Sequence, residues 1–316
     1  MDNLLLSIII PIYQEQNQVY DNIQTIHRVL AGKNIHHEFV LVDDGSRDHS
    51  WSEILRLSRD LGNIKAIRLS RNFGKEAALC AGLENISGDA CIIMDSDLQH
   101  PPQLIPEMVK LWKYDGYDVV EGVKASRGKE SLINKLGANA FYALLKKLSG
   151  LNLDRASDFK LLDKKVVDAW NRMGEKVVFF RGMSAWVGFK RISLPFEVAE
   201  RRDGKSKWSL YKLFKLAINA ITAFSSAPLQ IVTFIGVLFS IGAIILAIQT
   251  LYLKFMNIAF SGVTTVILLL LIIGSTLMIS LGIIGTYVAR IFDEVKGRPR
   301  YLVSEKISSI QKQEVH

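Results

Sequence analysis

Two acids and an amide follow directly after a short apolar run. Residues 90–94 are apolar, and Asp95, Asp97 and Gln99 come next at alternate positions. This pattern predicts a buried strand whose carboxyl end presents both carboxylates. In an extended segment such alternate side chains point to one side and would converge. Carboxylate and carbonyl oxygens suit a hard divalent cation such as Mg²⁺ or Mn²⁺. A surface turn with two solvated acids is the alternative interpretation.

Around this motif, short apolar runs typical of strands alternate with segments whose apolar residues recur at helical spacing. Such an alternation predicts an α/β fold with a mostly parallel sheet covered on both faces, which binds ligands at the carboxyl ends of its strands. Cys80 and Cys91 fall in apolar segments and are expected to be reduced core residues, with no zinc site. Strands are expected at 4–12, 38–42, 65–69, 90–94 and 118–123, helices at 19–31, 50–61, from 75 onward and at 103–114, and strands or short connections at 177–187 and 190–199.

Charge and hydropathy divide the chain into a polar part and an apolar part. The 316 residues carry a net charge of +8, but the basic residues do not form a nucleic-acid module, and no nucleic-acid partner is expected. They gather beside two uncharged runs, 229–253 and 255–289. A helix of about 20 apolar residues crosses a bilayer, so spans are predicted at 229–253 and 263–289. Helices of a soluble core are the alternative interpretation.

The flanks of the two runs predict an orientation. Basic residues lie outside both runs, whereas the connecting loop carries only Lys254, so the positive-inside rule places both flanks in the cytoplasm. Asp2 rather than a basic residue precedes the first apolar segment, and no secretory signal is expected. The predicted parts are a cytoplasmic α/β domain over 1–207, interfacial amphipathic helices over 208–227, a transmembrane hairpin over 228–290 and a cytoplasmic basic tail over 291–316.

Six motifs follow one another along the chain. They are IPIYQE at 10–15, VDDGS at 42–46, SRNFGKE at 70–76, MDSDLQHPP at 94–102, SDFKL at 157–161 and RRDGKSKW at 201–208. Together they resemble the family-2 glycosyltransferases of the GT-A fold. Within this family the chain is similar to polyisoprenyl-phosphate glycosyltransferases, which include dolichol-phosphate mannose synthases and bacterial bactoprenol glucosyltransferases. The two C-terminal runs make it more similar to the bactoprenol branch.

The resemblance implies a binding site for a nucleotide-sugar donor. Asp95, Asp97 and Gln99 would hold Mg²⁺ or Mn²⁺ against the diphosphate, where the cation neutralises the charge of the leaving group. For the acids of the VDDGS motif, a helix N-cap or turn role is the alternative. His100 is either a turn residue or a partner of the metal ligands. The residues implied for the base and ribose are Pro11, Tyr13, Glu15, Val42 and Asp44.

The resemblance also implies basic ligands for phosphate. Arg201, Ser206 and Lys207 form a segment just before the first apolar run, where bonds to phosphate oxygens would be charge-assisted. A patch for anionic lipid headgroups is the alternative. Lys124 stands where relatives often carry arginine, and lysine lacks the bidentate fork. Lys75 begins a predicted helix whose N-terminus also favours anions.

Asp158 has three interpretations. The resemblance implies a catalytic role for Asp158 beside Asp97 and Arg201, and makes Asp158 a candidate base that activates the acceptor. A lipid phosphate has a second pKa of about 6, so near neutral pH its oxygen is already a nucleophile and needs little help from a carboxylate. Orienting the sugar or the acceptor is therefore an equal interpretation, and capping a helix is the third.

The expected function is that of an enzyme in a bacterial inner membrane. It would transfer a hexose, with glucose favoured, from a UDP-sugar to undecaprenyl phosphate with inversion. Mannose or aminoarabinose transfer from the same site is an alternative, and a degenerate scaffold or flippase partner is the rival from another class. No tryptophan follows Gln-x-x-Arg, which counts against a processive polysaccharide synthase. Membrane lipids are expected partners, and a homo-oligomer is left open.

Overall fold

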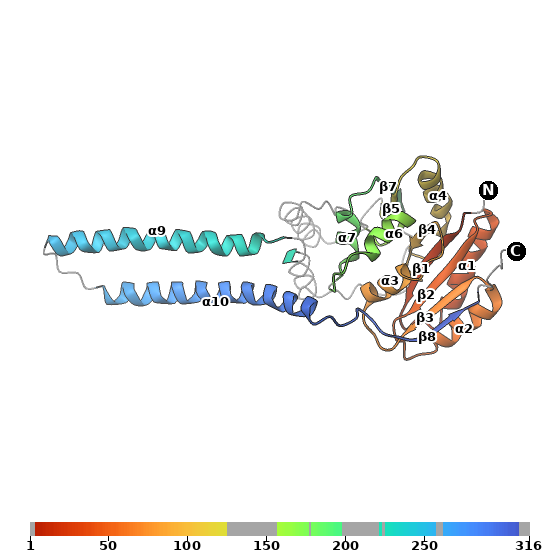
Figure 1. Ribbon diagram of the computed structural model, residues 1–316, viewed down its shortest axis with the longest axis horizontal. Helices are drawn as coiled ribbons and strands as arrows, with labels where there is room; N and C mark the ends of the chain where they lie inside the picture. The colour runs from red at the N-terminus through yellow and green to blue at the C-terminus, as the bar shows by residue number, and fades with distance from the viewer. Residues whose placement is uncertain are drawn as a thin grey trace. The chain divides into compact units, whose positions relative to one another are not determined.

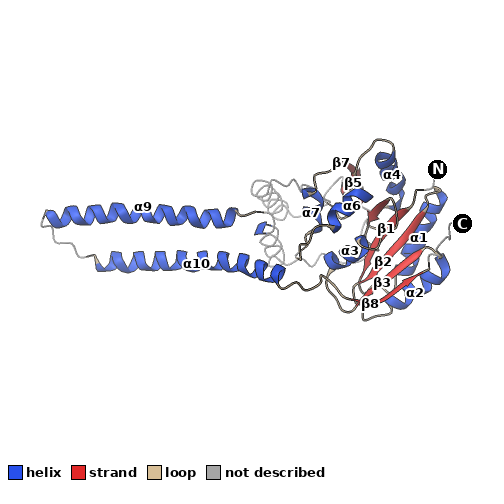
Figure 2. Cartoon of the chain, in the orientation of Figure 1, coloured by secondary structure: helices blue, strands red, loops and turns tan. Residues whose placement is uncertain are grey.

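The computed structural model describes two units of the chain. The described residues are 4–124, 157–176, 178–197, 221–222, 225–256 and 262–309. Figures 1 and 2 show the described strands in the first unit and the two longest helices in the second. The first unit comprises Met1–Lys146, Leu151–Trp208 and Arg298–His316, and the second Lys147–Gly150 and Ser209–Gly297.

The first unit follows the predicted alternation of strands and helices. Its strands are β1 (Leu6–Ile12), β2 (His37–Asp43), β3 (Ile64–Leu69), β4 (Ala90–Ile93), β5 (Val119–Lys124), β6 (Lys160–Asp163), β7 (Arg191–Phe196) and β8 (Val303–Ser308). Its described helices are α1 (Val19–Gly32), α2 (Ser50–Leu61), α3 (Lys75–Leu83), the 3-10 turn η1 (Pro102–Leu104), α4 (Ile105–Lys113), α6 (Lys164–Asn171) and α7 (Phe180–Trp186). The segment 177–187, expected as a strand or connection, thus contains a helix.

The eight described strands form a mixed sheet in the order β7-β5-β6-β4-β1-β2-β3-β8. β1 pairs in parallel with β2 and β4, β2 with β3, and β5 with β7. β6 is antiparallel to β4 and β5, and β8 is antiparallel to β3. The mostly parallel GT-A sheet that the sequence predicts is confirmed, while the two antiparallel strands were not predicted.

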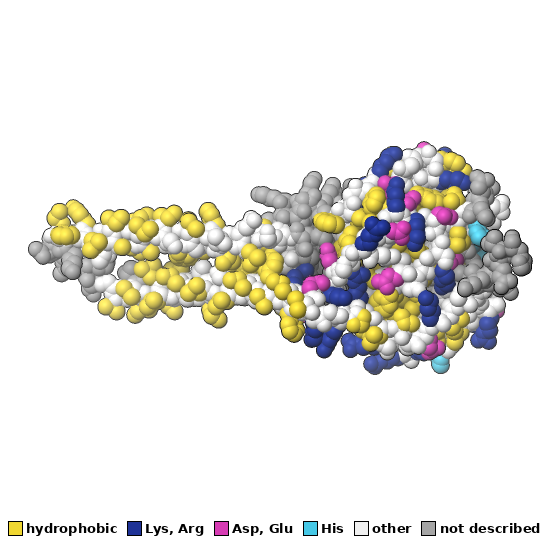
Figure 3. All heavy atoms as spheres, in the orientation of Figure 1, with side chains coloured by type: hydrophobic (Ala, Val, Ile, Leu, Met, Phe, Trp, Pro, Cys, Tyr) yellow, Lys and Arg dark blue, Asp and Glu magenta, His cyan; other side chains and the backbone are white. Residues whose placement is uncertain are grey.

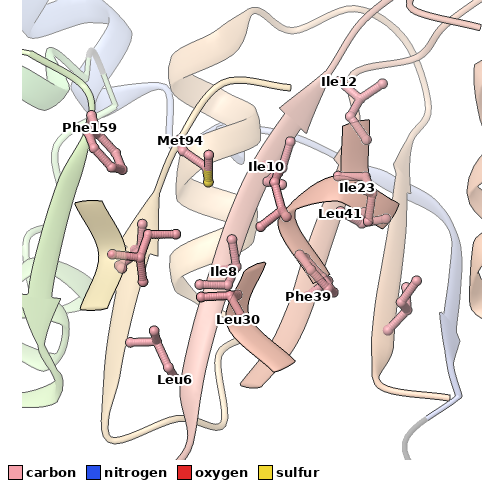
Figure 4. Packing of buried hydrophobic residues seen from close by; sticks show 14 of the residues in the cluster. Leu6, Ile8, Ile10, Ile12, Ile23, Leu30, Phe39, Leu41, Met94 and Phe159 are labelled. Carbon is pink, nitrogen blue, oxygen red and sulfur yellow. The ribbon is translucent and has the colours of Figure 1, made fainter. Parts of the chain in front are cut away.

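Both faces of the central strands are buried. On one face, alternate residues of β1 and β2 cluster with the apolar face of α1, as Figure 4 shows for Ile8, Leu30 and Phe39. On the other face, α3 packs against β1 at Gly82, where a Cβ would lie 2.3 Å from Cγ2 of Ile9. Only glycine permits this approach of helix to strand. The covering of both faces agrees with strands that are apolar along their whole length.

The chain returns to the sheet after its last apolar helix. β8 pairs with β3 from Lys65↔Ser308 to Leu69↔Val303. Before β8, the Arg300 guanidinium donates to the backbone carbonyl of Glu175 at 2.7 Å. The segment 291–316 therefore differs from the basic tail expected, because most of its described part belongs to the first unit. The physical reason is that β3 would otherwise be an open edge, which an alternating strand can pair.

The second unit contains two long apolar helices, α9 (Ala227–Phe255) and α10 (Val263–Val295). Ala227–Leu253 and Leu269–Val295 are long and apolar enough to cross a membrane, with mean hydropathies of 2.8 and 2.2. Figure 3 shows hydrophobic side chains along both helices, whereas charged side chains gather on the first unit. The spans predicted at 229–253 and 263–289 fall on these helices. Most of the interfacial segment expected at 208–227 lies outside the described residues.

Candidate active site

The acid loop, which follows β4 and carries Asp95, Asp97 and Gln99, has its backbone held by neighbouring side chains. The Asp95 N–H donates to Nδ1 of His100 at 3.2 Å, and the His100 ring stacks on Phe159 with ring centroids 5.0 Å apart. The Asn22 amide donates to the carbonyl of Ser96 at 2.7 Å. Since His100 is buried, it acts as a partner of the loop rather than as a plain turn residue.

This loop is not extended as the alternation argument assumed. β4 ends at Ile93, the chain turns at Asp97, and Leu98 has a φ of 57°. The reason is local, because the Asp97 carboxylate accepts a hydrogen bond from the Gln99 N–H at 3.0 Å, and aspartate bonds of this kind favour a turn. Convergence of Asp95, Asp97 and Gln99 through strand geometry is therefore wrong, although the three residues share one short loop.

The pairing of β4 with β6 brings a second acid to the same edge. Ile93 lies opposite Lys160, so Asp158 precedes β6 beside the point where β4 ends. Lys75, the first residue of α3, joins the two acids: its Nζ lies 2.6 Å from Oδ1 of Asp95 and 2.8 Å from Oδ2 of Asp158. The structure therefore brings together three residues that the sequence placed in separate motifs.

Arg181 of α7 joins Lys75, Asp95 and Asp158 in one charged cluster. Its Nε donates to Oδ1 of Asp158 at 2.7 Å and its second guanidinium nitrogen donates to Oδ2 at 3.1 Å. Burial by itself would raise the pKa of Asp158, but the bonds and charges of Arg181 and Lys75 outweigh burial and hold this pKa well below its ordinary value. A carboxylate in this state is a poor proton acceptor near neutral pH, so the geometry favours a positioning role for Asp158 over the role of a base.

Buried polar groups fix the helix that carries Arg181. The Glu76 carboxylate accepts the N–H of Phe180 at 2.9 Å. Lys160, which is 1% exposed, forms an ion pair with Glu121 at 3.0 Å and donates to the Ser184 hydroxyl at 2.7 Å. Burial raises the pKa of Glu76 to about 7, although the bond from Phe180 partly opposes this. The start of α7 and its residue Ser184 are thus held by side chains of other elements.

Asp44 anchors the loop that leads into α3. Its two carboxylate oxygens accept the N–H of Phe73 at 2.7 Å and of Gly74 at 2.9 Å. Burial raises the pKa of Asp44, and these two hydrogen bonds lower it in part. Gly45 allows the close approach, since its φ is 66° and a Cβ would lie 2.4 Å from the carbonyl carbon of Arg71. In this structure Asp44 therefore positions the start of α3.

Tyr13 and Glu15 lie in the turn after β1. Glu15 accepts a hydrogen bond from the Ser96 hydroxyl and so touches the acid loop. Burial raises the pKa of Glu15 to about 7; the Ser96 bond opposes this, and the charges of Asp97 and Asp95 add to it. Tyr13 is 41% exposed and offers its ring to solvent beside this turn. The IPIYQE motif thus reaches the same loop as the predicted metal ligands.

The structure describes the surroundings of only some of the remaining predicted ligands. Pro11 is half-buried near the carboxyl end of β1, and Val42 is fully buried in β2, so its side chain lines no open surface. Lys124 is the last residue of β5, but its side chain is outside what the structure describes. The basic residues expected before the membrane, Arg201, Ser206 and Lys207, lie outside the described residues.

The acid loop suits a hard divalent cation. Asp95 has a side chain that is 35% exposed, and Asp97 is exposed, so both carboxylates are open to a ligand. The ammonium of Lys75 already bonds to Asp95, which shows that a positive charge is accommodated there. Mg²⁺ is commonly held by one or two carboxylates, with its other positions left for phosphate and water. The residues present therefore fit Mg²⁺ or Mn²⁺.

Sequence reasoning did not identify Arg181 or Glu76 as site residues. Glu76 lies in the SRNFGKE motif but has no spacing that assigns it a role. Arg181 follows four apolar residues, and a lone arginine after such a run indicates a candidate site residue. Its partner Asp158 lies 23 positions earlier, and no local pattern links them.

The chain is similar to known glycosyltransferases over nearly its whole length. The chain is 36% identical to an uncharacterized glycosyltransferase of Synechocystis over 303 residues, covering 95% of each chain. It is 33% identical to a prophage bactoprenol glucosyl transferase homolog of Escherichia coli, covering 94% of this chain and 98% of that one. It is 32% identical to a bactoprenol glucosyl transferase of Shigella phage SfX, covering 95% and 99%.

The family assignment covers the strands and loops described above. The model of the family described as "Glycosyl transferase family 2" matches residues 7–170, a range that runs from β1 through α6 and includes Lys75, the acid loop and Asp158. Since this match covers more than half of the chain, and the relatives align over nearly all of it, the protein belongs to glycosyltransferase family 2.

Proposed function

We propose that this protein transfers a hexose, with glucose favoured, from a UDP-sugar to undecaprenyl phosphate at the cytoplasmic face of a bacterial inner membrane. One observation carries the proposal. The acid loop and the Lys75–Asp158 pair share one edge of a sheet in a chain that also holds two helices apolar enough to cross a bilayer. The relatives named bactoprenol glucosyl transferase support the lipid acceptor and the sugar.

The proposed reaction is one displacement. An oxygen of the acceptor phosphate attacks the anomeric carbon, the bond from that carbon to UDP breaks, and the electron pair leaves with UDP. Attack from the face opposite the leaving group inverts the configuration. Asp95, Asp97 and Gln99 would hold Mg²⁺ or Mn²⁺, which supplies neutralisation of the charge on the leaving diphosphate. Lys75 lies beside this loop and adds a positive charge to it.

The donor nucleotide is proposed to lie along the turn after β1. Tyr13 offers an exposed ring for the base, and Glu15 links this turn to the acid loop. Asp44, with Pro11 and Val42 in the strands beneath, would support this side of the site. Further phosphate contacts are proposed for Lys124 at the end of β5 and for Arg201, Ser206 and Lys207.

Chain connectivity supports the proposed membrane arrangement. Leu151–Trp208, which precedes α9, and Arg298–His316, which follows α10, belong to the same unit. An even number of crossings must therefore separate them, as a hairpin of α9 and α10 would provide. The basic residues flanking both helices favour the cytoplasm for this unit. A lipid acceptor and a soluble donor would then meet at the bilayer surface.

The test uses membranes that contain the full-length protein. They are incubated with a panel of radiolabelled nucleotide sugars, undecaprenyl phosphate and Mg²⁺ or Mn²⁺, and the label entering the organic phase is measured. Asp97→Asn removes one proposed metal ligand, and Asp115→Asn makes the same charge change at an exposed turn after α4. We expect label from UDP-glucose with the wild type and Asp115→Asn, and at least a hundredfold less with Asp97→Asn.

Three outcomes would contradict the proposal. Label from another nucleotide sugar alone would change the donor, and a polymeric product would indicate a processive synthase. No lipid-linked label with any donor, and identical behaviour of wild type and Asp97→Asn, would favour a scaffold without activity.

A further inference from the structure

Four charged side chains form a row along the edge of the sheet. Asp95 contacts Lys75 at 2.6 Å, Lys75 contacts Asp158 at 2.8 Å, and Asp158 contacts Arg181 at 2.7 Å. Acid and base alternate, so each acid has a basic neighbour. Arg181 stands at the end of the row away from the acid loop, and its side chain is 38% exposed. The row therefore carries a positive group that is distinct from the proposed metal position.

The position of Arg181 is built into the fold. Its helix is held at the start by Glu76 and at Ser184 by Lys160, and the Ser184 hydroxyl donates to the Arg181 carbonyl at 3.1 Å. Lys160 is nearly inaccessible, and burying a charge of this kind is costly unless it is paired. Arg181 is thus presented by a supported helix rather than by a loose surface segment.

The chemistry of this row suits a second phosphate. The donor diphosphate would share the cation held by the acid loop, whereas the acceptor phosphate is a separate dianion and needs positive groups of its own. A guanidinium and an ammonium that flank one carboxylate provide them, since arginine binds phosphate oxygens through two parallel hydrogen bonds. Asp158 lies between them and holds the ammonium of Lys75 and the guanidinium of Arg181 in fixed positions before the phosphate binds.

We infer that Arg181, with Lys75, binds the phosphate of the polyprenyl acceptor, and that Asp158 is a positioning residue that aims these two cations. This inference rests on the proposed function, because it assigns the acceptor half of the same site. It gives Asp158 a role that needs no proton transfer. It also assigns Arg181 to the acceptor and the acid loop to the donor, with Lys75 in contact with both Asp95 and Asp158.

The test measures the two ligands separately with the full-length protein in detergent. Farnesyl phosphate serves as the acceptor probe, farnesol and inorganic phosphate as comparisons, and UDP with Mn²⁺ as the donor probe, all by calorimetry. The variants are Arg181→Gln and Arg181→Lys. Arg172→Gln is the matched control, because Arg172 is exposed at the end of α6 and belongs to no part of the site.

We expect Arg181→Gln to weaken farnesyl phosphate binding about 10- to 100-fold, as the loss of hydrogen bonds to a charged group implies. Arg181→Lys keeps the positive charge but loses the two parallel donors of the guanidinium, so its affinity for farnesyl phosphate should lie between those of the wild type and Arg181→Gln. UDP binding should change less than twofold in both, which also shows that the site is folded. Asp158→Asn should weaken farnesyl phosphate binding as well, and Arg172→Gln should change neither ligand.

Several results would overturn the inference. An equal loss of UDP affinity in Arg181→Gln would assign Arg181 to the donor. Unchanged farnesyl phosphate affinity in both Arg181 variants would remove Arg181 from the acceptor site. Inorganic phosphate binding as tightly as farnesyl phosphate would indicate a free-phosphate site instead.

The transfer assay keeps this inference separate from the proposed function. If the wild type transfers no sugar to a polyprenyl phosphate but Arg181→Gln still binds farnesyl phosphate more weakly than the wild type, the proposed reaction is wrong and the phosphate site stands. If the wild type does transfer sugar and Arg181→Gln keeps its acceptor KM, the reaction stands and the inference fails.

Discussion

Glu305 of β8 is the residue whose substitution tests how this last strand is joined to the rest of the first unit. Its Oε2 accepts the indole N–H of Trp51 at 3.1 Å, and its Oε1 accepts a guanidinium N–H of Arg68 at 3.1 Å. Trp51 is only 5% exposed, whereas the Glu305 side chain is 48% exposed. Arg68 also lies 3.3 Å from Oδ2 of the buried Asp43. One carboxylate thus connects three elements.

The structure sets the size of the effect. Glu305→Ala leaves a buried indole N–H without its acceptor, at a cost of about 1–3 kcal/mol. The half-exposed ion pair with Arg68 adds about 0.2–1 kcal/mol. Glu305→Gln keeps a carbonyl oxygen for the indole and loses only the ion pair. We therefore expect the alanine variant to lose about 2 kcal/mol more of the free energy of unfolding than the glutamine variant.

The assay is denaturation of the full-length protein in detergent, followed by tryptophan fluorescence and by thermal unfolding. A loss of about 2 kcal/mol in a unit of this size lowers the melting temperature by roughly 4–8 °C. The glutamine variant should stay within about 2 °C of the wild type. Equal shifts for alanine and glutamine would refute the reasoning, since they would mean that the Trp51 bond contributes nothing.

Four further predictions follow from the site and the fold. The transfer rate should rise with pH through about 6, where the lipid phosphate loses its second proton. Asp158→Asn should lower the rate without moving this inflection, because the pKa of Asp158 lies well below its ordinary value. A displaced inflection would indicate that Asp158 acts as a base. The raised Glu76 pKa of about 7, against 4.5 for the free group, means that between these values the folded state holds a proton that the unfolded state lacks. Stability should therefore fall as pH rises through this window, by on the order of 1–3 kcal/mol, and Glu76→Gln should flatten the pH dependence of the urea midpoint. Gly45→Ala should cost about 2–4 kcal/mol in denaturant titrations because its φ is positive and its Cβ would strike Arg71, whereas Gly32→Ala, with open space, should cost nothing. Chelation by EDTA should abolish transfer, and added Mn²⁺ or Mg²⁺ should restore it; activity that survives dialysis against EDTA would remove the metal from the site.

The sequence alone determined the features that depend on local pattern. The apolar runs that became β1, β2 and β4, and the spacing that became α1 and α2, follow from burial on two faces or on one face. The length and composition of α9 and α10 were likewise readable, because a helix long enough for a bilayer needs only consecutive apolar residues. The acids at the end of β4 were visible for the same reason, since an abrupt change from apolar to charged residues marks a strand end.

Tertiary structure decided what lies beside those residues. The Ile93↔Lys160 register brings Asp158 to the acid loop, and a helix from a third region supplies Arg181 to it. The strand β8 pairs with β3 across more than 200 positions of sequence, as the Arg68 contact with Glu305 shows with a separation of 237. No periodicity encodes such pairings, because they depend on which edge or surface remains open once the local elements have formed.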